Sequence, residues 1–319
     1  MCVETCEPTP SMKAPLELGV FSLTILLMFS VGMVLDGRHF REVAARKGLI
    51  LSTLLTQAVA LPALACALTR LLELRPHLRA GILLLAMCPV GGIANVCTLL
   101  ARANVALSVT VNTLTCLLSA ATMALTTLVY DRVFHEPFVF AVPTPSLILN
   151  LVLMVVLPVL AGMGLRRFKP GPVERWARTS RTLSLAGVAL LVVYVLVGER
   201  ERLGAEWKQT ASAAAAFMAV AMLLGLSFGR LSRLPARDVM TMGLLFTTRN
   251  VALASAIAIT LLNRVEFAVF AATYFVVEVP LILCAIALYC RGWERGDAAP
   301  CANVSVEITN RVPYARKHF

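Results

Sequence analysis

A single arginine lies in the middle of a long apolar segment, and its chemistry needs an explanation. The segment MGLLFTTRNVALASAIAITLL, residues 242–262, carries Arg249 near its centre with Asn250 beside it. An arginine at the centre of a membrane helix costs about 2.5–3.5 kcal/mol, so it needs acceptors or a task. An acid, Glu278, lies in the following apolar segment, YFVVEVPLIL. We predict an intramembrane charge pair between Arg249 and Glu278, which orders the helix packing, attracts an anionic solute, or does both.

Helix-breaking and polar residues cluster in an earlier apolar segment, CPVGGIANVCTLLA at residues 88–101. Pro89 removes a backbone donor and clashes with the preceding turn, and Gly91 and Gly92 permit close backbone approach. The pattern predicts a helix interrupted at these three residues, with Asn95 just beyond the interruption. Interrupted helices near the membrane midplane mark transporter binding sites, because their free ends offer N–H and C=O groups to a solute.

Other polar side chains lie in neighbouring apolar segments. Gln57 precedes Pro62 by five residues. Ser108 and Asn112 are spaced i, i+4, so they share one face of a helix. Polar side chains also serve as ordinary contacts between membrane helices. For Gln57 together with Asn95 and its glycines we favour a binding site over simple packing.

The composition places these residues in a polytopic membrane protein. Hydrophobic residues make up 59% of the 319 residues, and the mean hydropathy is +0.81, above the range of soluble domains. The apolar residues form blocks of about 20, the length that crosses a bilayer core. We predict an all-α membrane protein with nine transmembrane helices. The predicted spans are residues 15–35, 49–69, 80–100, 105–130, 143–165, 182–198, 209–229, 239–262 and 267–290.

The charge pattern predicts the orientation in the membrane. A net charge of +11 on a soluble protein would suggest nucleic acid, but here the basic residues are topology signals and no nucleic-acid partner is expected. Lys and Arg concentrate in alternate loops and in the C-terminal tail, so we place the N-terminus outside and the C-terminus in the cytoplasm. The predicted parts are an outer tail at residues 1–14, a nine-helix domain at 15–290 and a flexible tail at 291–319.

Signals for catalysis and for metal binding are weak. The sequence contains no H-E-x-x-H motif and no paired aspartates inside the spans, so we expect no enzyme. It has no CxxC pattern and only four scattered histidines, so no metal centre or cofactor is expected. Cys2 and Cys6 lie on the outer tail and could pair, but nothing requires it.

Three stretches together resemble the bile acid:sodium symporter family. CPVGGIANVCTLLARANVALSV, residues 88–109, is similar to the fourth-helix signature of that family, P-G-G-x-x-S-N followed by A-R-G-[DN]-x-x-L-S. VGMVLDGRHFREVAARKGLILSTLLTQAVALPAL, residues 31–64, resembles its second and third helices, and TTRNVALASAIA, residues 247–258, falls where the family has E-x-G-x-Q-N-x-x-L-A. The resemblance covers about residues 15–290.

The resemblance implies an inverted-repeat transporter that works by alternating access between a panel group and a core group of helices. Two broken helices would cross in the core. Their crossing would form the substrate site, and the residues that match it are Gly91, Gly92, Asn95, Thr247, Thr248, Arg249 and Asn250. The break in the second of these helices is implied by the resemblance alone, because its sequence has no proline and only Gly243 near its start.

The family's two sodium sites carry over only in part. The positions that match as oxygen ligands are Gln57, Asn95, Ser108 and Asn112. At the first site Ala94 replaces a serine and Leu245 replaces the acidic residue, and at the second Arg249 replaces a glutamine. We therefore expect uptake to persist without sodium, with protonation of Glu278 as the alternative coupling reaction.

These observations lead to a functional hypothesis with one rival. We expect a secondary transporter of an organic anion, such as a bile-acid-like solute, a keto acid or a pantoate-like acid. The rival is a membrane sensor or assembly subunit that retains the transporter fold without moving a solute. If Arg249 and Glu278 form a pair, Arg249→Gln should be harmful unless Glu278→Gln accompanies it.

Overall fold

The structure is a computed structural model, and nearly all of its secondary structure is helical. It describes the backbone of residues 10–34, 46–134, 149, 152–198, 200–262 and 264–294. Within these ranges the β-structure is a single isolated bridge. The first helix begins at Pro10 and the last ends at Glu294, so helix extends into both predicted tails. The predicted Cys2–Cys6 pair lies outside the described residues.

The helices follow the apolar blocks of the sequence. In chain order they are α1 (Pro10–Val34), α3 (Lys47–Leu71), α4 (Pro76–Met87), α5 (Ile93–Leu100), α6 (Val105–Phe134), the π-helix η1 (Val152–Val156), α8 (Leu157–Phe168), α9 (Pro170–Gly198), α10 (Arg200–Leu231), α11 (Ala236–Thr247), α12 (Val251–Ala256), the π-helix η2 (Ile257–Leu261) and α13 (Val265–Glu294). Each of the nine predicted ranges falls mainly on helical residues in the part of the chain that the structure describes.

Five helices of the described ranges are long and apolar enough to cross a membrane by themselves. They are Lys47–Leu71, Val105–Thr126, Gly171–Gly198, Glu206–Leu231 and Val265–Arg291. Pro76–Met87 and Val251–Leu261 are apolar but shorter, because each belongs to a helix that is interrupted in its middle. The protein is therefore an all-α membrane protein, and the number of nine spans stays a prediction.

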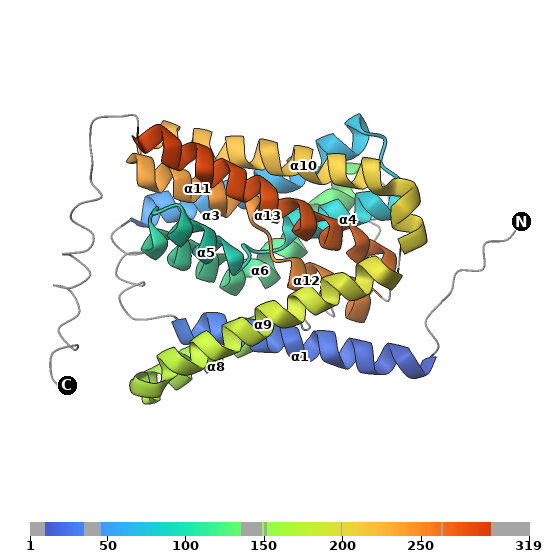
Figure 1. Cartoon of the computed structure of the whole chain (residues 1–319), viewed down its shortest axis with the longest axis horizontal. Helices are drawn as coiled ribbons and strands as arrows, with labels where there is room; N and C mark the ends of the chain where they lie inside the picture. Colours follow the sequence, from blue (N-terminus) through green and yellow to red (C-terminus); the bar gives the residue numbers. More distant parts are fainter. Residues whose placement is uncertain are drawn as a thin grey trace, which may run out of the picture.

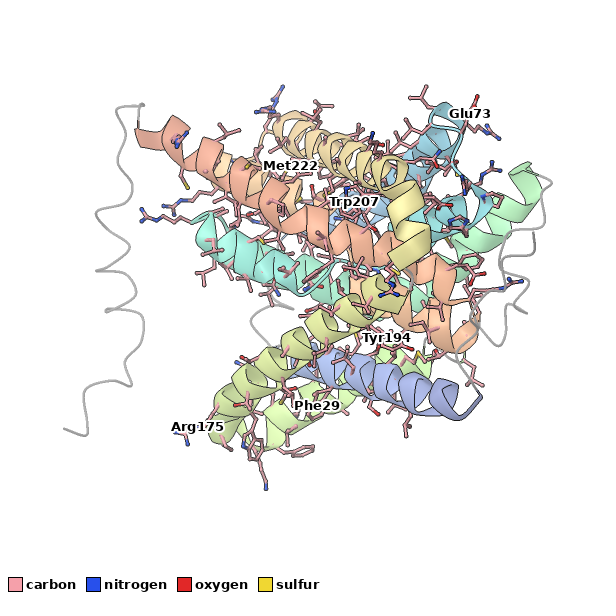
Figure 2. The ribbon with its side chains drawn as sticks, turned by 45° about the vertical axis from the view of Figure 1, so that its right-hand side comes forward. Phe29, Glu73, Arg175, Tyr194, Trp207 and Met222 are labelled. Carbon is pink, nitrogen blue, oxygen red and sulfur yellow. The ribbon has the colours of Figure 1, made fainter. Side chains whose placement is uncertain are left out.

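The helices form a smaller and a larger group (Figure 1). The smaller group consists of α1, α8 and α9, which pack on one another, and the larger group contains α3 to α6 and α10 to α13. In Figure 2, Phe29 and Arg175 lie in the smaller group, and Trp207 and Met222 lie in the larger one. A Cβ atom on Gly162 of α8 would lie 2.3 Å from the Phe29 carbonyl oxygen of α1, so only glycine permits this contact.

The larger group shows the same order of elements twice. A long helix, α3 or α10, ends in a turn that contains one residue with positive φ, Glu73 (46°) or Arg233 (53°). A 12-residue helix follows, α4 or α11, and then an interruption and a second short helical piece. A 30-residue helix, α6 or α13, completes each series. This repetition places two interrupted helices at equivalent positions.

A glycine pair brings α10 and α11 together. The stretch GLSFG at residues 225–229 has the spacing of a serine-hydrolase motif, but it lies inside the continuous helix α10 rather than on a strand-to-helix turn. A Cβ atom on Gly225 would lie 2.5 Å from the Met242 carbonyl oxygen, and one on Gly229 would lie 2.9 Å from Val239 Cα. The motif therefore serves helix packing.

Candidate functional site

The two interrupted helices cross where each one is broken. Helix α4 ends at Met87 and α5 begins at Ile93, so the interruption predicted at Pro89, Gly91 and Gly92 is present. Helix α11 ends at Thr247 and α12 begins at Val251, so the second break is present as well.

The broken segments bind each other through their backbones. Val90 and Arg249 form the isolated antiparallel bridge. The Gly91 N–H donates to the Thr248 carbonyl oxygen at 3.4 Å, and the Asn250 N–H donates to the Pro89 carbonyl oxygen at 3.0 Å. These bonds replace helical hydrogen bonds that the two interruptions remove.

The two glycines of the first break have different roles. A Cβ atom on Gly91 would lie 2.6 Å from the Arg249 carbonyl oxygen, closer than such contacts allow. A Cβ atom on Gly92 would meet nothing within 4 Å, and the φ of Gly92 is −60°, a helical value that any residue adopts. Gly91 is therefore required for the close approach of the two segments, whereas Gly92 is not.

The Arg249 side chain is buried, at 3% exposure, and binds oxygen atoms around the crossing. Its Nη2 donates to the Leu245 carbonyl oxygen at 2.8 Å, and its Nη1 donates to the Cys88 carbonyl oxygen at 3.1 Å. Its Nε donates to the Thr248 carbonyl oxygen at 3.2 Å, and Nη2 also donates to Gln57 Oε1 at 3.4 Å. The guanidinium is therefore held by the protein's own oxygen atoms.

The location of these oxygen atoms explains why a cation is stable there. Leu245 lies in the last turn of α11, and Cys88 directly follows the last residue of α4. The C-terminal end of a helix carries a partial negative charge, since its last carbonyl groups have no intrahelical partner. Arg249 thus binds the partially negative C-terminal ends of α4 and α11.

The predicted ion pair between Arg249 and Glu278 is absent from the described structure. Glu278 is completely buried on α13, but neither of its carboxylate oxygens has a hydrogen-bond partner among the described residues. Charge–charge attraction predicted the pair from the sequence. The carbonyl groups at the two helix ends satisfy the guanidinium instead, and their positions depend on how the helices cross.

Two side chains stabilise the second break. The Asn250 Oδ1 accepts a hydrogen bond from the Leu253 N–H at 3.0 Å and so caps α12. The Tyr274 hydroxyl of α13 donates to the Thr247 carbonyl oxygen near the end of α11. The sequence interpretation missed Tyr274, although a phenolic hydroxyl inside a span needs an acceptor and could have identified it.

The threonines predicted for the substrate site bind their own helix. The Thr247 hydroxyl donates to the Gly243 carbonyl oxygen at 2.9 Å, and the Thr248 hydroxyl donates to the Leu244 carbonyl oxygen at 2.8 Å. Both hydroxyl groups use the i−4 carbonyl of α11, a common arrangement for threonine in membrane helices. Their hydroxyl hydrogens therefore point into the helix.

The residues that match the first sodium site lie partly together. The Ser108 hydroxyl donates to Asn95 Oδ1 at 2.8 Å, and Thr98, which the sequence interpretation missed, donates to Ser108 at 3.2 Å. Asn112 is buried one turn further along α6, and its Nδ2 has no partner among the described residues. The Leu245 side chain is fully buried in an apolar cluster with Ala94 and other residues, so it contributes no oxygen where the family has a carboxylate.

Gln57 connects α3 with the crossing. Its Nε2 donates to the Leu245 carbonyl oxygen at 3.4 Å, while its Oε1 accepts from Arg249. A cavity of about 40 Å³ lies beside it, lined by residues of α3, α4 and α6 together with Cys88, Pro89 and Arg249. This volume has room for water, because a cavity of about 10–15 Å³ is enough to hold one water molecule.

Comparison with known proteins finds relatives that are named as sodium-dependent transporters or cotransporters. Residues 22–206 match the sodium bile acid symporter family. The matched residues include the first interruption and end before the second. Over 178 residues the chain is 28% identical to the uncharacterized sodium-dependent transporter YocS of Bacillus subtilis, an alignment that covers 56% of this chain and 54% of that protein.

Two further relatives come from plants and animals. The chain is 27% identical over 212 residues to the probable chloroplastic sodium/metabolite cotransporter BASS1 of Arabidopsis thaliana, covering 66% of this chain and 51% of the relative. It is 27% identical over 183 residues to the human ileal sodium/bile acid cotransporter, covering 55% of this chain and 50% of the relative. The chain thus spans about half the length of the curated relatives that it matches.

Proposed function

The chain belongs to the sodium bile acid symporter family, and we propose that it is a secondary transporter that carries an organic anion through the membrane. The family description and the names of the relatives are those of transporters rather than enzymes. The observation that carries the proposal is the crossing of two interrupted helices at a buried arginine.

The crossing favours an anion for electrostatic reasons. Helices α5 and α12 both begin at the crossing, so their N-terminal ends bring partial positive charge to it. Arg249 adds a full positive charge that main-chain carbonyl oxygens stabilise without neutralising. An anion near this region is attracted by all three groups, whereas a cation is repelled.

The packing of the two groups supports alternating access. The smaller group contacts the larger one mainly through α12, η2 and α13, and η1 contacts α6. The apolar clusters around α5 and the first part of α11 contain described residues of the larger group alone. With the predicted orientation, the turn between α5 and α6 faces the cytoplasm, so we assign this conformation as open to the cytoplasm. The nine spans and an inverted relation between the two repeated series belong to the same proposal.

Classical sodium coupling does not fit the residues at either site. The first site has oxygen atoms from Asn95 and Ser108, which bind each other, and Leu245 supplies no carboxylate. At the second site the guanidinium of Arg249 takes the carbonyl oxygens and the Gln57 oxygen that a sodium ion would need. Arginine does not lose its charge at physiological pH, so this tethered cation is permanent. We therefore propose that transport does not require sodium.

Uptake into proteoliposomes tests the proposal. Purified protein is first screened by thermal shift against taurocholate, pyruvate and pantoate, which represent the three solute classes, with sodium or choline as the cation. Uptake of the solutes that stabilise the protein is then measured in the same two media. We expect equal uptake in sodium and in choline. Strict sodium dependence would overturn the coupling proposal, and binding without flux would favour a sensor.

A further inference from the structure

Glu278 is a buried charged residue that has no ion-pair partner among the described residues and no task in the proposed mechanism. It lies on α13 at 0% exposure, two residues before Pro280, and no described group donates a hydrogen bond to either carboxylate oxygen. Two titratable groups of the described chain interact with it electrostatically: Arg249 from the second interruption and Tyr274 from its own helix. Both are close enough to sense its charge, but neither forms a hydrogen bond with it.

Most donors of these two neighbours are used elsewhere. Arg249 donates through Nε, Nη1 and Nη2 to oxygen atoms at the ends of α4 and α11 and to Gln57. The Tyr274 hydroxyl donates to the Thr247 carbonyl oxygen. A fully buried carboxylate that accepts no hydrogen bond is much less stable than its neutral acid.

We propose that Glu278 carries a proton in this conformation and that this proton controls the net charge of the crossing. With the proton bound, the crossing has a net charge of one, the positive charge of Arg249. When the O–H bond breaks, its electron pair stays on the carboxylate, the proton leaves to water, and the two side chains sum to zero charge. This inference rests on the proposed transport of an anion.

Binding of the anion and of the proton are then linked. An anionic solute is attracted more strongly when the crossing is positive, so it binds better while Glu278 is protonated. Linkage is reciprocal, so a bound anion also holds the proton more tightly. The protein would therefore carry the proton and the anion in the same direction, as a proton-coupled symporter.

Infrared spectroscopy tests the proton directly, without any solute. The full-length protein in lipid is titrated with alkali while the absorption of protonated carboxyl groups is recorded. We expect a band at neutral pH that Glu278→Gln removes and that Glu266→Gln leaves in place. Glu266 is a matched control because it lies on the same helix, is partly exposed and pairs with Arg264. Absence of the band from the unmodified protein, or its survival in Glu278→Gln, would overturn the proposal.

Uptake into proteoliposomes tests the linkage. Taurocholate, pyruvate and pantoate are supplied separately, with the interior either at the external pH or more alkaline. For a transported probe we expect apparent affinity to fall about tenfold as the external pH is raised, and Glu278→Gln to abolish this dependence. If uptake by the unmodified protein does not depend on pH, the proposed linkage between anion binding and proton binding is overturned. If no probe is transported, the anion-transport function fails for these solutes, while the infrared band still decides the protonation of Glu278.

Discussion

The two interrupted helices reach the same geometry by different means. The first, between α4 and α5, contains a proline and two glycines, which disfavour a continuous helix without help from other elements. The second, between α11 and α12, consists of Thr248, Arg249 and Asn250, none of which prevents helix formation to the same degree. Here Arg249 and Tyr274 bind carbonyl groups, and Asn250 caps the following helix.

This difference shows that a helix break can be local or imposed by neighbours. The first break depends on backbone sterics within a few residues, whereas the second depends on side chains that reach across the crossing. The residues matched by the family end at residue 206, so they include the first break and exclude the second. Removing a side chain that holds the second break should therefore affect stability more than replacing Pro89 at the first break.

Arg249→Gln should have the largest effect. Glutamine is shorter and has only two N–H donors, so it cannot satisfy the oxygen atoms at the ends of α4 and α11. Because a buried group that loses its partner costs about 1–3 kcal/mol, we expect the free energy of unfolding to fall by about 3 kcal/mol. The measurement is thermal unfolding of purified protein in detergent. Arg264→Gln is the control, since Arg264 is largely exposed and its pair with Glu266 contributes little.

Adding Glu278→Gln to Arg249→Gln tests whether Arg249 and Glu278 form an ion pair or whether Glu278 is protonated. If Arg249 and Glu278 were an ion pair, the double variant would recover stability, because no charge would remain unpaired. The absence of the pair, together with a protonated Glu278, predicts equal melting temperatures for the single and double variants. Recovery in the double variant would contradict the observed geometry.

The difference in stability between Gly91→Ala and Gly92→Ala should be the next largest effect. The added methyl group at Gly91 would push against the backbone of Arg249 and separate the two segments, at a cost of about 1–3 kcal/mol. At Gly92 the methyl group enters open space, so we expect a change within about 0.5 kcal/mol. Equal melting temperatures of the two variants would show that the close contact at Gly91 is unimportant.

Tyr274→Phe removes one hydrogen bond from the second break. The Thr247 carbonyl oxygen loses its donor while the ring keeps its packing against Phe217 and Phe270, so we expect a loss of about 1 kcal/mol. Tyr194→Phe on α9 provides the control, because Tyr194 is exposed. A melting temperature as high as that of the control would argue that the hydroxyl group does not stabilise the break.

Pro89→Ala should have the smallest effect. The Pro89 carbonyl oxygen, which accepts from the Asn250 N–H, is retained in alanine, and the two glycines remain. Alanine gives the unfolded chain more conformational freedom than proline does, which should lower the free energy of unfolding by about 0.4–1 kcal/mol. Thermal unfolding and uptake should both stay close to those of the unmodified protein. A loss as large as that of Arg249→Gln would show that the first break also depends on a single residue.

The sequence by itself determined the helical membrane fold, the positions of the apolar segments and the first interruption. These features depend on hydrophobic length and on the backbone properties of proline and glycine, which act within a few residues. Gln57, Asn95 and Ser108 were also identified from the sequence, and the structure joins Asn95 to Ser108 and Gln57 to Arg249.

Only the tertiary structure decided the partners of the buried charges. The sequence suggested that Arg249 would bind Glu278, because opposite charges attract in an apolar medium. The crossing instead brings the carbonyl ends of α4 and α11 to the guanidinium, and no group in the described part of the chain donates to Glu278. Main-chain carbonyl groups occur at every residue, so no sequence pattern marks the few that become free. Which of them meet a side chain depends on where two helices end and cross.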